Sequence, residues 1–148
     1  MARIKIELPE KSIATFKIPV RITDINYGNH VGNDSLVAII HEARMQFLHQ
    51  HGYTEMDVAG TSLIMNELLV EFKNEAFYKD ILEVKLFAGE IFKVGFEFFY
   101  SLSAIRGQSS ILIAKAKTGM VCFDYNEKKL MQVPGELKNI LLLVIGNT

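Results

Sequence analysis

Hydrophobic and polar residues recur with two different periods along the chain. In segment 33–51 the main apolar residues are spaced by three and four positions: Leu36, Ile40, Ala43 and Phe47. This spacing is typical of one face of an α-helix. Further apolar residues, Val37, Ile39 and Leu48, extend beyond that face. The segment therefore predicts one long helix, much of it buried.

The residues at both ends of this segment indicate where the helix begins and ends. Asn33 is of a type favoured at the N-cap, and Asp34 places a negative charge at the positive end of the helix dipole. Gly52 is typical of a helix stop.

Strand-like stretches surround the helix. One precedes it at 15–23, and four follow it at 62–75, 80–91, 96–105 and 110–125. The joints between the last four are short, which implies antiparallel pairing. The order predicts an α+β fold in which a curved antiparallel sheet of about five strands wraps a long central helix. We expect a bend at Gly119, inside the last strand.

Composition narrows the class of protein. The chain has 148 residues, 49% hydrophobic and 22% charged, as expected of a single folded domain spanning 1–148. A formal net charge of −1 argues against nucleic-acid binding through bulk charge. One cysteine, Cys122, permits no intrachain disulfide and favours a cytoplasmic protein. The sequence shows neither a signal peptide nor a membrane span, and a mean hydropathy of +0.18 favours an oligomer.

The connection between the first strand and the helix carries the candidate chemistry. Its polar residues stand beside two glycines, Gly28 and Gly32, and are Asp24, Asn26, Asn29, His30 and Asn33. Glycine lets the backbone approach a ligand, and the free N–H groups of a helix start bind a carbonyl oxygen or an anion. Asp24 and His30 are groups that can transfer protons.

This connection resembles the signature of the hotdog-fold acyl-CoA thioesterases, and most of all the 4-hydroxybenzoyl-CoA thioesterase-like group. The residues that carry the resemblance are the segment Asp24-x-Asn26-x-x-x-His30-Val31-x-Asn33 and the later His41-Glu42-Ala43-Arg44. Segment 133–137 resembles the short C-terminal turn or helix of the family. The resemblance implies hydrolysis of an acyl-CoA or acyl-carrier-protein thioester without metal or cofactor. It also implies a homodimer with sheets joined edge to edge, often paired into a homotetramer.

The resemblance also implies roles for the loop, with one departure. Much of the family has an aspartate at the position of Asn26, and an amide cannot act as a general base. Asn26 would instead orient water or polarise the thioester carbonyl. Asp24 or His30 would then be the base, unless a glutamate from elsewhere supplies it or the chain is a weak enzyme. The expected substrate-binding residues are Tyr27, Gly28, Asn29, Val31, Gly32 and Asn33.

Three glutamates are further candidates. Glu42 is expected deep in the apolar helix, where its carboxylate needs a partner such as Arg21. Glu67 and Glu71 lie four residues apart and share one strand face. Either would complete the site of a partner subunit, although exposed or subunit-contact charges are the simpler interpretation.

Two other functions remain open from the sequence. One is an acyl-thioester binding protein without turnover, and the other is a hotdog dehydratase or hydratase. The spacing typical of a zinc site and the glycine fingerprints of phosphate loops are both missing. The aromatic segment 92–100 and Cys122 are expected in the core.

Overall fold

The computed structural model describes residues 4–143 and has the predicted order of one strand, one long helix and then the other strands. The elements, in chain order, are β1 (Ala14–Pro19), a 3-10 turn η1 (Ile22–Asp24), α1 (Asn33–Gln50), β2 (Ser62–Phe72), β3 (Ile81–Ile91), β4 (Gly95–Arg106), β5 (Ser109–Asp124), β6 (Lys129–Leu130) and α2 (Gly135–Leu141).

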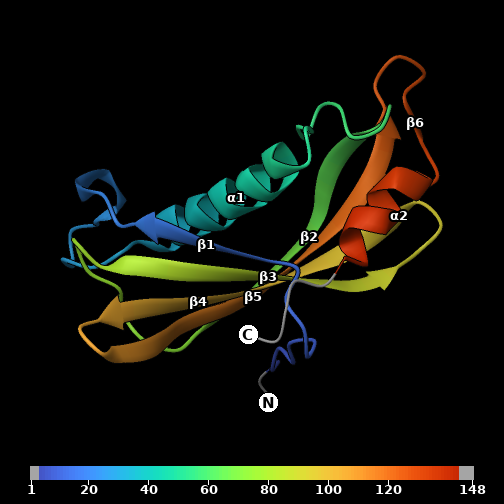
Figure 1. The fold of residues 1–148 in the computed structure, drawn as a ribbon. Coiled ribbons are helices and arrows are strands. Elements are labelled where there is room, and N and C mark those ends of the chain that lie inside the picture. Colours follow the sequence, from blue (N-terminus) through green and yellow to red (C-terminus); the bar gives the residue numbers. More distant parts are fainter. Residues whose placement is uncertain (1–3, 144–148) are drawn as a thin grey trace.

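All strand pairs are antiparallel, as the short joints predict. The strands follow the order β1-β3-β4-β5-β2, and the two-residue β6 pairs with β5. The sheet curves, and α1 lies along its concave side (Figure 1). This confirms the predicted α+β architecture of a central helix and a wrapping sheet.

The predicted helix face is the one that packs on the sheet. Leu36, Ile40, Ala43 and Phe47 are all buried. The Phe47 ring meets the Phe98 ring of β4 edge-on, with centroids 5.8 Å apart. Because β4 alternates, the buried rings and alkyl groups of this strand all belong to one face: Phe96, Phe98, Tyr100, Leu102 and Ala104. The prediction that the aromatic segment 92–100 forms core is confirmed for Phe96, Phe98 and Tyr100 and is wrong for Phe92, which is exposed.

The ends of α1 differ in one respect from the prediction. Gly52 follows the C-cap residue His51 and has φ +80°, the left-handed conformation that suits glycine. The N-cap, however, is Gly32, and no side chain caps it. Asn33 is the first residue of the helix, so the prediction of an asparagine N-cap is wrong.

The first strand is shorter than predicted. It ends at Pro19, which has no N–H group to donate to a ladder. Residues 22–24 form η1 in place of the expected strand end. β1 therefore ends well before α1 begins, and the candidate residues lie in the connection between them.

Opposite Gly119, where a bend is predicted, the paired strand has a register shift. The shift lies between Met65 and Glu67 of β2, and Glu67 pairs with Gly119. A Cβ at position 119 would lie 2.8 Å from Asn66 Oδ1, so a larger residue would collide with the bulge. At the other end of the chain, the predicted C-terminal helix is α2, which buries Leu137 and Leu141.

Candidate functional site

The connection between β1 and α1 is a tight loop held by its own backbone. Ile25 and Val31 form an isolated antiparallel bridge, and the Asn26 N–H donates to the His30 carbonyl at 3.0 Å. The Val31 N–H donates to the carbonyl of Ala76 at 2.8 Å, which ties the loop to the segment after β2. The loop therefore presents its side chains from a fixed backbone.

Asp24 contacts the backbone of its own loop. Its side chain is buried, and Oδ2 accepts the Arg21 backbone N–H at 2.8 Å. The Arg21 guanidinium lies 3.7 Å from the same oxygen, and the Asp24 carbonyl accepts the Gly32 N–H. These contacts fit an aspartate that stabilises a turn.

The side chains of His30 and Asn26 both approach the side of Gly28 where another residue would have its Cβ. A Cβ at position 28 would lie 3.2 Å from His30 Nε2 and 3.3 Å from Asn26 Oδ1. His30 Nδ1 lies 3.1 Å from the Val31 carbonyl oxygen, which can only accept a hydrogen bond. Nδ1 therefore carries the proton of the neutral ring, and the lone pair is on Nε2.

A backbone hydrogen bond also fixes the orientation of the Asn26 amide. Its Oδ1 accepts the Gly28 N–H at 2.9 Å, so Nδ2 points the other way. Nδ2 lies 3.6 Å from the position of a Cβ on Gly32, the N-cap of α1. In the described chain, the N–H groups of Asn33, Asp34 and Ser35 have no acceptor. Nδ2 thus stands near a group of free backbone donors.

Asp34, whose charge was predicted only to suit the helix dipole, is also a titratable group near the site. Its Oδ1 lies 2.7 Å from the position of a Cβ on Gly32, close to the Asn26 amide. Gly32 was the feature of the sequence that could have indicated this, because a residue without a side chain lets Asp34 and Asn26 approach each other.

The other predicted loop residues divide into two groups. Tyr27 and Asn29 are exposed, and Asn29 adopts φ +65° at the tip of the turn. Val31 is buried in the core, and Asn33 is exposed at the helix start. Val31 supplies backbone contacts to the loop, whereas Tyr27 and Asn33 are open to a ligand.

The expectation for Glu42 is wrong. Glu42 is exposed and accepts a hydrogen bond from Gln46 at 2.8 Å, whereas Arg21 pairs with Asp24. The buried charge is Arg44 instead. Arg44 follows the buried Ile40 by four residues, so the two share a helix face that Glu42 does not.

Arg44 belongs to a polar network that sequence reasoning missed. Its Nε donates to Glu55 Oε2 at 2.8 Å, and its Nη1 donates to Tyr100 Oη at 3.3 Å. Tyr100 Oη lies 2.7 Å from Thr118 Oγ1, and His41 Nε2 lies 2.6 Å from Glu55 Oε1. His41 is thus half-exposed and hydrogen-bonded. Glu55 comes from the connection after α1, which shows no periodicity that could have revealed it.

The network sets the protonation of its members. Partial burial acts to raise the pKa of Glu55, but the hydrogen bonds and charges of Arg44 and His41 outweigh it and hold that pKa below its usual value. Burial raises the pKa of Tyr100, although Arg44 and Thr118 act against that shift. Glu55 is therefore a carboxylate and Tyr100 a neutral phenol.

Glu67 and Glu71 have partners away from the loop. Glu67 pairs with Lys117 at 2.9 Å. Glu71 pairs with Lys73 at 2.8 Å and accepts the Ile6 N–H. In residues 4–143 no hydrogen bond or ion pair joins either glutamate to segment 21–33.

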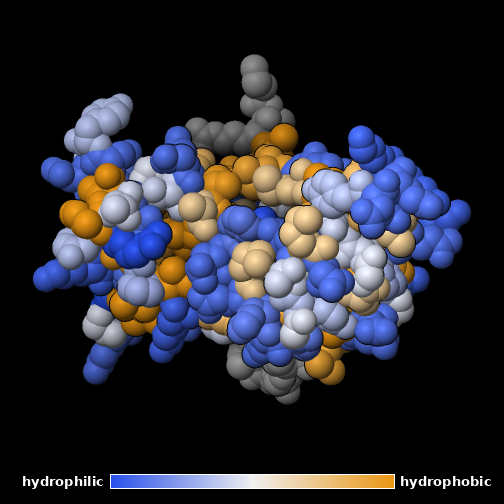
Figure 2. Space-filling model, turned by 90° about the horizontal axis from the view of Figure 1, so that it is seen from above, coloured by the Kyte–Doolittle hydropathy of each residue, from blue (hydrophilic) through white to orange (hydrophobic). Residues whose placement is uncertain are grey.

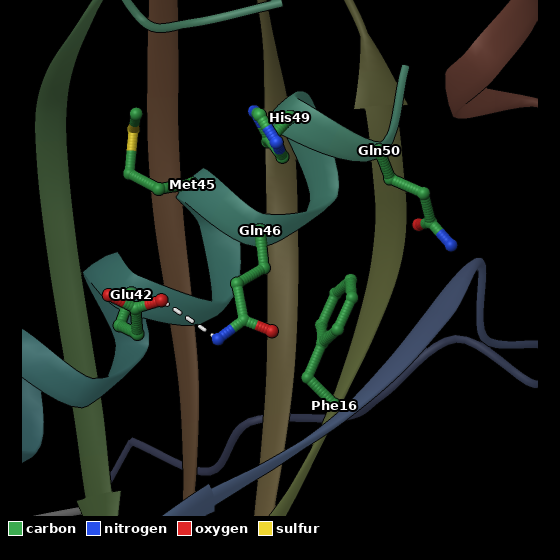
Figure 3. Close-up of a pocket in the computed structure, with 6 residues that line it drawn as sticks. All are labelled: Phe16, Glu42, Met45, Gln46, His49 and Gln50. Atoms are coloured by element: carbon green, nitrogen blue, oxygen red, sulfur yellow. Dashed lines mark hydrogen bonds between the residues drawn. The ribbon is translucent and has the colours of Figure 1, made fainter. Parts of the chain in front are cut away.

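Three grooves in the described part of the chain run beside α1. The smallest, of about 260 Å³, is lined by Lys17, Ile18, Pro19, Arg21, Asp24, Ala38, Ile39, Glu42 and Gln46. The α1/β1 groove has a volume of about 640 Å³ and is lined by Phe16, Glu42, Met45, Gln46, His49 and Gln50. Phe16 stands across it from the glutamines (Figure 3). The α1/β2 groove, of about 340 Å³, is lined by Val37, Ile40, His41, Arg44, Glu55, Leu63, Ile64, Met65, Leu68, Thr118 and Tyr125. Apolar residues stay exposed between hydrophilic ones on the side that carries α1 (Figure 2).

The described residues show neither a metal cluster nor a membrane helix. No three His, Cys, Asp or Glu side chains in 4–143 gather as metal ligands would. None of the helices in this range is both long and apolar enough to span a bilayer.

Comparison with known proteins identifies the family. Residues 20–141 match the model of the thioesterase-like superfamily. A protein of Aquifex aeolicus (strain VF5) named "Putative esterase" is 32% identical over 102 residues, which cover 68% of this chain and 75% of that protein.

Solved structures share the fold. A 1,4-dihydroxy-2-naphthoyl-CoA thioesterase from Synechocystis has a TM-score of 0.73 at 20% identity, over 86% of this chain and 93% of that one. A hypothetical protein from Aquifex aeolicus has a TM-score of 0.75 at 24% identity, over 86% and 98% of the two chains. The chain has the hotdog fold and belongs to the thioesterase-like superfamily.

Proposed function

We propose that this protein hydrolyses an acyl thioester of coenzyme A or acyl carrier protein to the free acid and the thiol. The observation that carries the proposal is the shared position above Gly28, within 3.3 Å of both His30 Nε2 and Asn26 Oδ1. Both atoms accept hydrogen bonds, and a water molecule held between them, farther from the Gly28 Cα than a bonded Cβ would be, would donate one hydrogen to each. Its oxygen lone pair would then be free to attack a carbonyl carbon.

His30 is the proposed general base. Its Nε2 takes a proton from the water as the oxygen attacks the thioester carbon. The imidazolium then returns the proton to the sulfur as the carbon–sulfur bond breaks, which leaves the acid and the thiol. The Val31 carbonyl, which accepts from Nδ1, keeps the ring oriented throughout.

The carbonyl oxygen is proposed to lie between Asn26 Nδ2 and the start of α1. Negative charge builds on this oxygen as water attacks, and donors placed in advance stabilise it. Asn26 Nδ2 and the free N–H groups of residues 33–35 are donors of this kind. In this arrangement Asn26 serves through both ends of its amide, a role that an aspartate could not fill.

We also propose that the protein is a homodimer, or a homotetramer built from dimers. β2 is a terminal strand of the sheet, and its exposed apolar residues include Met65, Leu68 and Phe72. An open apolar edge is a surface that proteins cover. Light scattering after size exclusion measures the mass, and a monomer at micromolar concentration would contradict the proposal.

The direct test is thiol release from acetyl-, octanoyl-, palmitoyl- and benzoyl-CoA, followed with a thiol-reactive dye. Turnover that His30→Ala abolishes supports the proposal. The same acyl groups on acyl carrier protein come next. Binding of S-octyl-CoA without turnover of any thioester would favour a binding protein instead. Conversion of a 3-hydroxyacyl-CoA to an enoyl-CoA without thiol release would favour a dehydratase.

A further inference from the structure

Arg44 uses only part of its hydrogen-bonding capacity. A guanidinium has five N–H groups. Within residues 4–143, Nε donates to Glu55 and Nη1 to Tyr100, whereas Nη2 has no acceptor. Every fully buried side-chain nitrogen and oxygen in this range does have a partner. Nη2 is therefore not sealed in the core, and the free space beside Arg44 is the α1/β2 groove that it lines.

The α1/β2 groove begins near the proposed catalytic loop. Val37, Ile40 and Arg44 follow Asn33 by steps of four, three and four residues, which keeps them on one side of α1. At a rise of ~1.5 Å per residue, the Cα of Arg44 lies about 16 Å along the helix from Asn33. Long helix side chains lean towards the N-terminus, so the guanidinium is nearer than that.

The groove between these points is mostly apolar. β2 forms its second wall with Leu63, Ile64 and Leu68, opposite Val37 and Ile40 of α1. The segment after β2 is hydrogen-bonded to the β1–α1 loop through the Ala76 carbonyl. The β2 side of the groove is therefore connected to the loop that carries the proposed site. The groove is therefore a mostly apolar channel with one free donor beside it.

We propose that Arg44 determines substrate specificity: the α1/β2 groove binds the acyl group, and Nη2 donates to an uncharged hydroxyl or keto oxygen far from the thioester. The inference rests on the proposed function. An uncharged oxygen fits because Glu55, 2.8 Å from Nε, already balances the charge of Arg44. A substrate carboxylate would add a second buried negative charge without its own partner.

The preference for an oxygenated over a plain acyl group follows from a hydrogen bond that the plain group cannot make. A plain acyl chain would displace water from Nη2 and offer it no acceptor. Sites built to bond a substrate oxygen reject the analogue that lacks it. We expect a preference of about 10- to 100-fold for the oxygenated acyl group, from one charge-assisted hydrogen bond.

The test compares matched pairs of substrates. Octanoyl-, decanoyl- and dodecanoyl-CoA are each measured beside the CoA thioester that carries a terminal hydroxyl. We expect the hydroxylated member to have the higher kcat/KM by at least 10-fold for one or more lengths, mainly through KM. Equal values at all three lengths would overturn the inference while leaving the proposed function intact.

Arg44→Lys separates recognition from folding. Lysine keeps a positive charge beside Glu55 but lacks the planar fork that places Nη2. The ratio of kcat/KM values between the two members of a pair is expected to fall towards one. The matched control is Arg106→Lys, because Arg106 pairs with Asp80 outside the groove. It should keep the wild-type ratio, and thermal unfolding verifies that both variants fold. A wild-type ratio in Arg44→Lys would overturn the inference.

Binding provides a readout that needs no turnover. The probes are S-decyl-CoA and its 10-hydroxydecyl counterpart, thioethers that cannot be hydrolysed, measured by calorimetry. Tighter binding of the hydroxylated probe, lost in Arg44→Lys, supports the inference even without catalysis. Equal binding of the two probes overturns it. Failure of both to bind overturns the inference, whereas the proposed function is decided separately by thiol release from the acyl-CoA and acyl-carrier-protein substrates.

Discussion

His30 Nε2 and Asn26 Oδ1 converge on one position, the place where a Cβ on residue 28 would lie, at 3.2 and 3.3 Å. Both atoms accept hydrogen bonds, so they can hold between them one water molecule, which has two hydrogens to donate. A glycine at 28 leaves the space beside the two acceptors open.

Gly28→Ala fills that position with a methyl group. Gly28 has no positive φ, so the backbone accepts alanine. We expect kcat to fall at least 10-fold, while the free energy of unfolding changes by less than about 1 kcal/mol. Gly135→Ala is the control, since a Cβ there meets no atom within 4 Å. Full activity in Gly28→Ala would place the attacking water elsewhere.

His30→Ala and Asp24→Asn distinguish base from scaffold. Loss of a general base costs about 10²- to 10⁴-fold in kcat, and we expect that loss in His30→Ala. Asp24→Asn keeps an oxygen for the Arg21 N–H and should retain kcat within about threefold of wild type, because a general base would cost far more. Asp34→Asn is measured in the same steady-state assay. A larger loss of kcat in Asp24→Asn or in Asp34→Asn than in His30→Ala would assign the base to that carboxylate.

Asn26→Asp tests the amide nitrogen. The aspartate can still accept the Gly28 N–H, but a carboxylate oxygen replaces the donor Nδ2. We expect kcat to fall by about 10²- to 10³-fold, the loss typical of one oxyanion donor. Asn29→Asp, on the exposed tip of the same loop, is the matched control. A rise in kcat for Asn26→Asp would show instead that this position needs an acid.

The stability that Glu55 contributes should depend on pH. Its pKa in the folded protein lies below the ordinary 4.5, so it stabilises the fold fully above that value. The contribution is lost as the pH falls through the lowered pKa. In urea titrations, the difference in unfolding free energy between wild type and Glu55→Gln should be constant from pH 7 to about 5.5, then shrink towards pH 3. A difference that grows on acidification would contradict this. At pH 7 the exposed Glu42→Gln should match wild type.

Cys122 should be unreactive in the folded protein. Burial raises the pKa of its thiol to about 11, and only the thiolate reacts with disulfide reagents. At pH 8 we expect labelling of the native protein to be about 100-fold slower than in guanidinium chloride, from the smaller thiolate fraction alone. Labelling at the unfolded rate would show that Cys122 is accessible.

The elements could be predicted because local sequence determines them. The three- and four-residue spacing of Leu36, Ile40, Ala43 and Phe47 belongs to a helix whatever packs on it. Short polar joints likewise require antiparallel strands. The loop was recognisable too, because Asn26, His30 and the glycines lie within a few residues of one another. That the loop ends at the first turn of α1 could also be predicted, because the helical pattern begins directly after these residues.

The roles of individual charges were decided only by the tertiary structure. Glu42 and Arg44 are neighbours in sequence, yet only Arg44 finds partners in the core, from Glu55 on the following loop and Tyr100 on β4. Asp24 and His30 were equivalent candidates in the sequence, and only the folded loop shows that Asp24 bonds to the Arg21 N–H and that His30 Nε2 lies beside Asn26. Local periodicity determines which residues form a helix or strand, whereas a buried charge depends on partners that are distant in sequence and meet only when the chain folds.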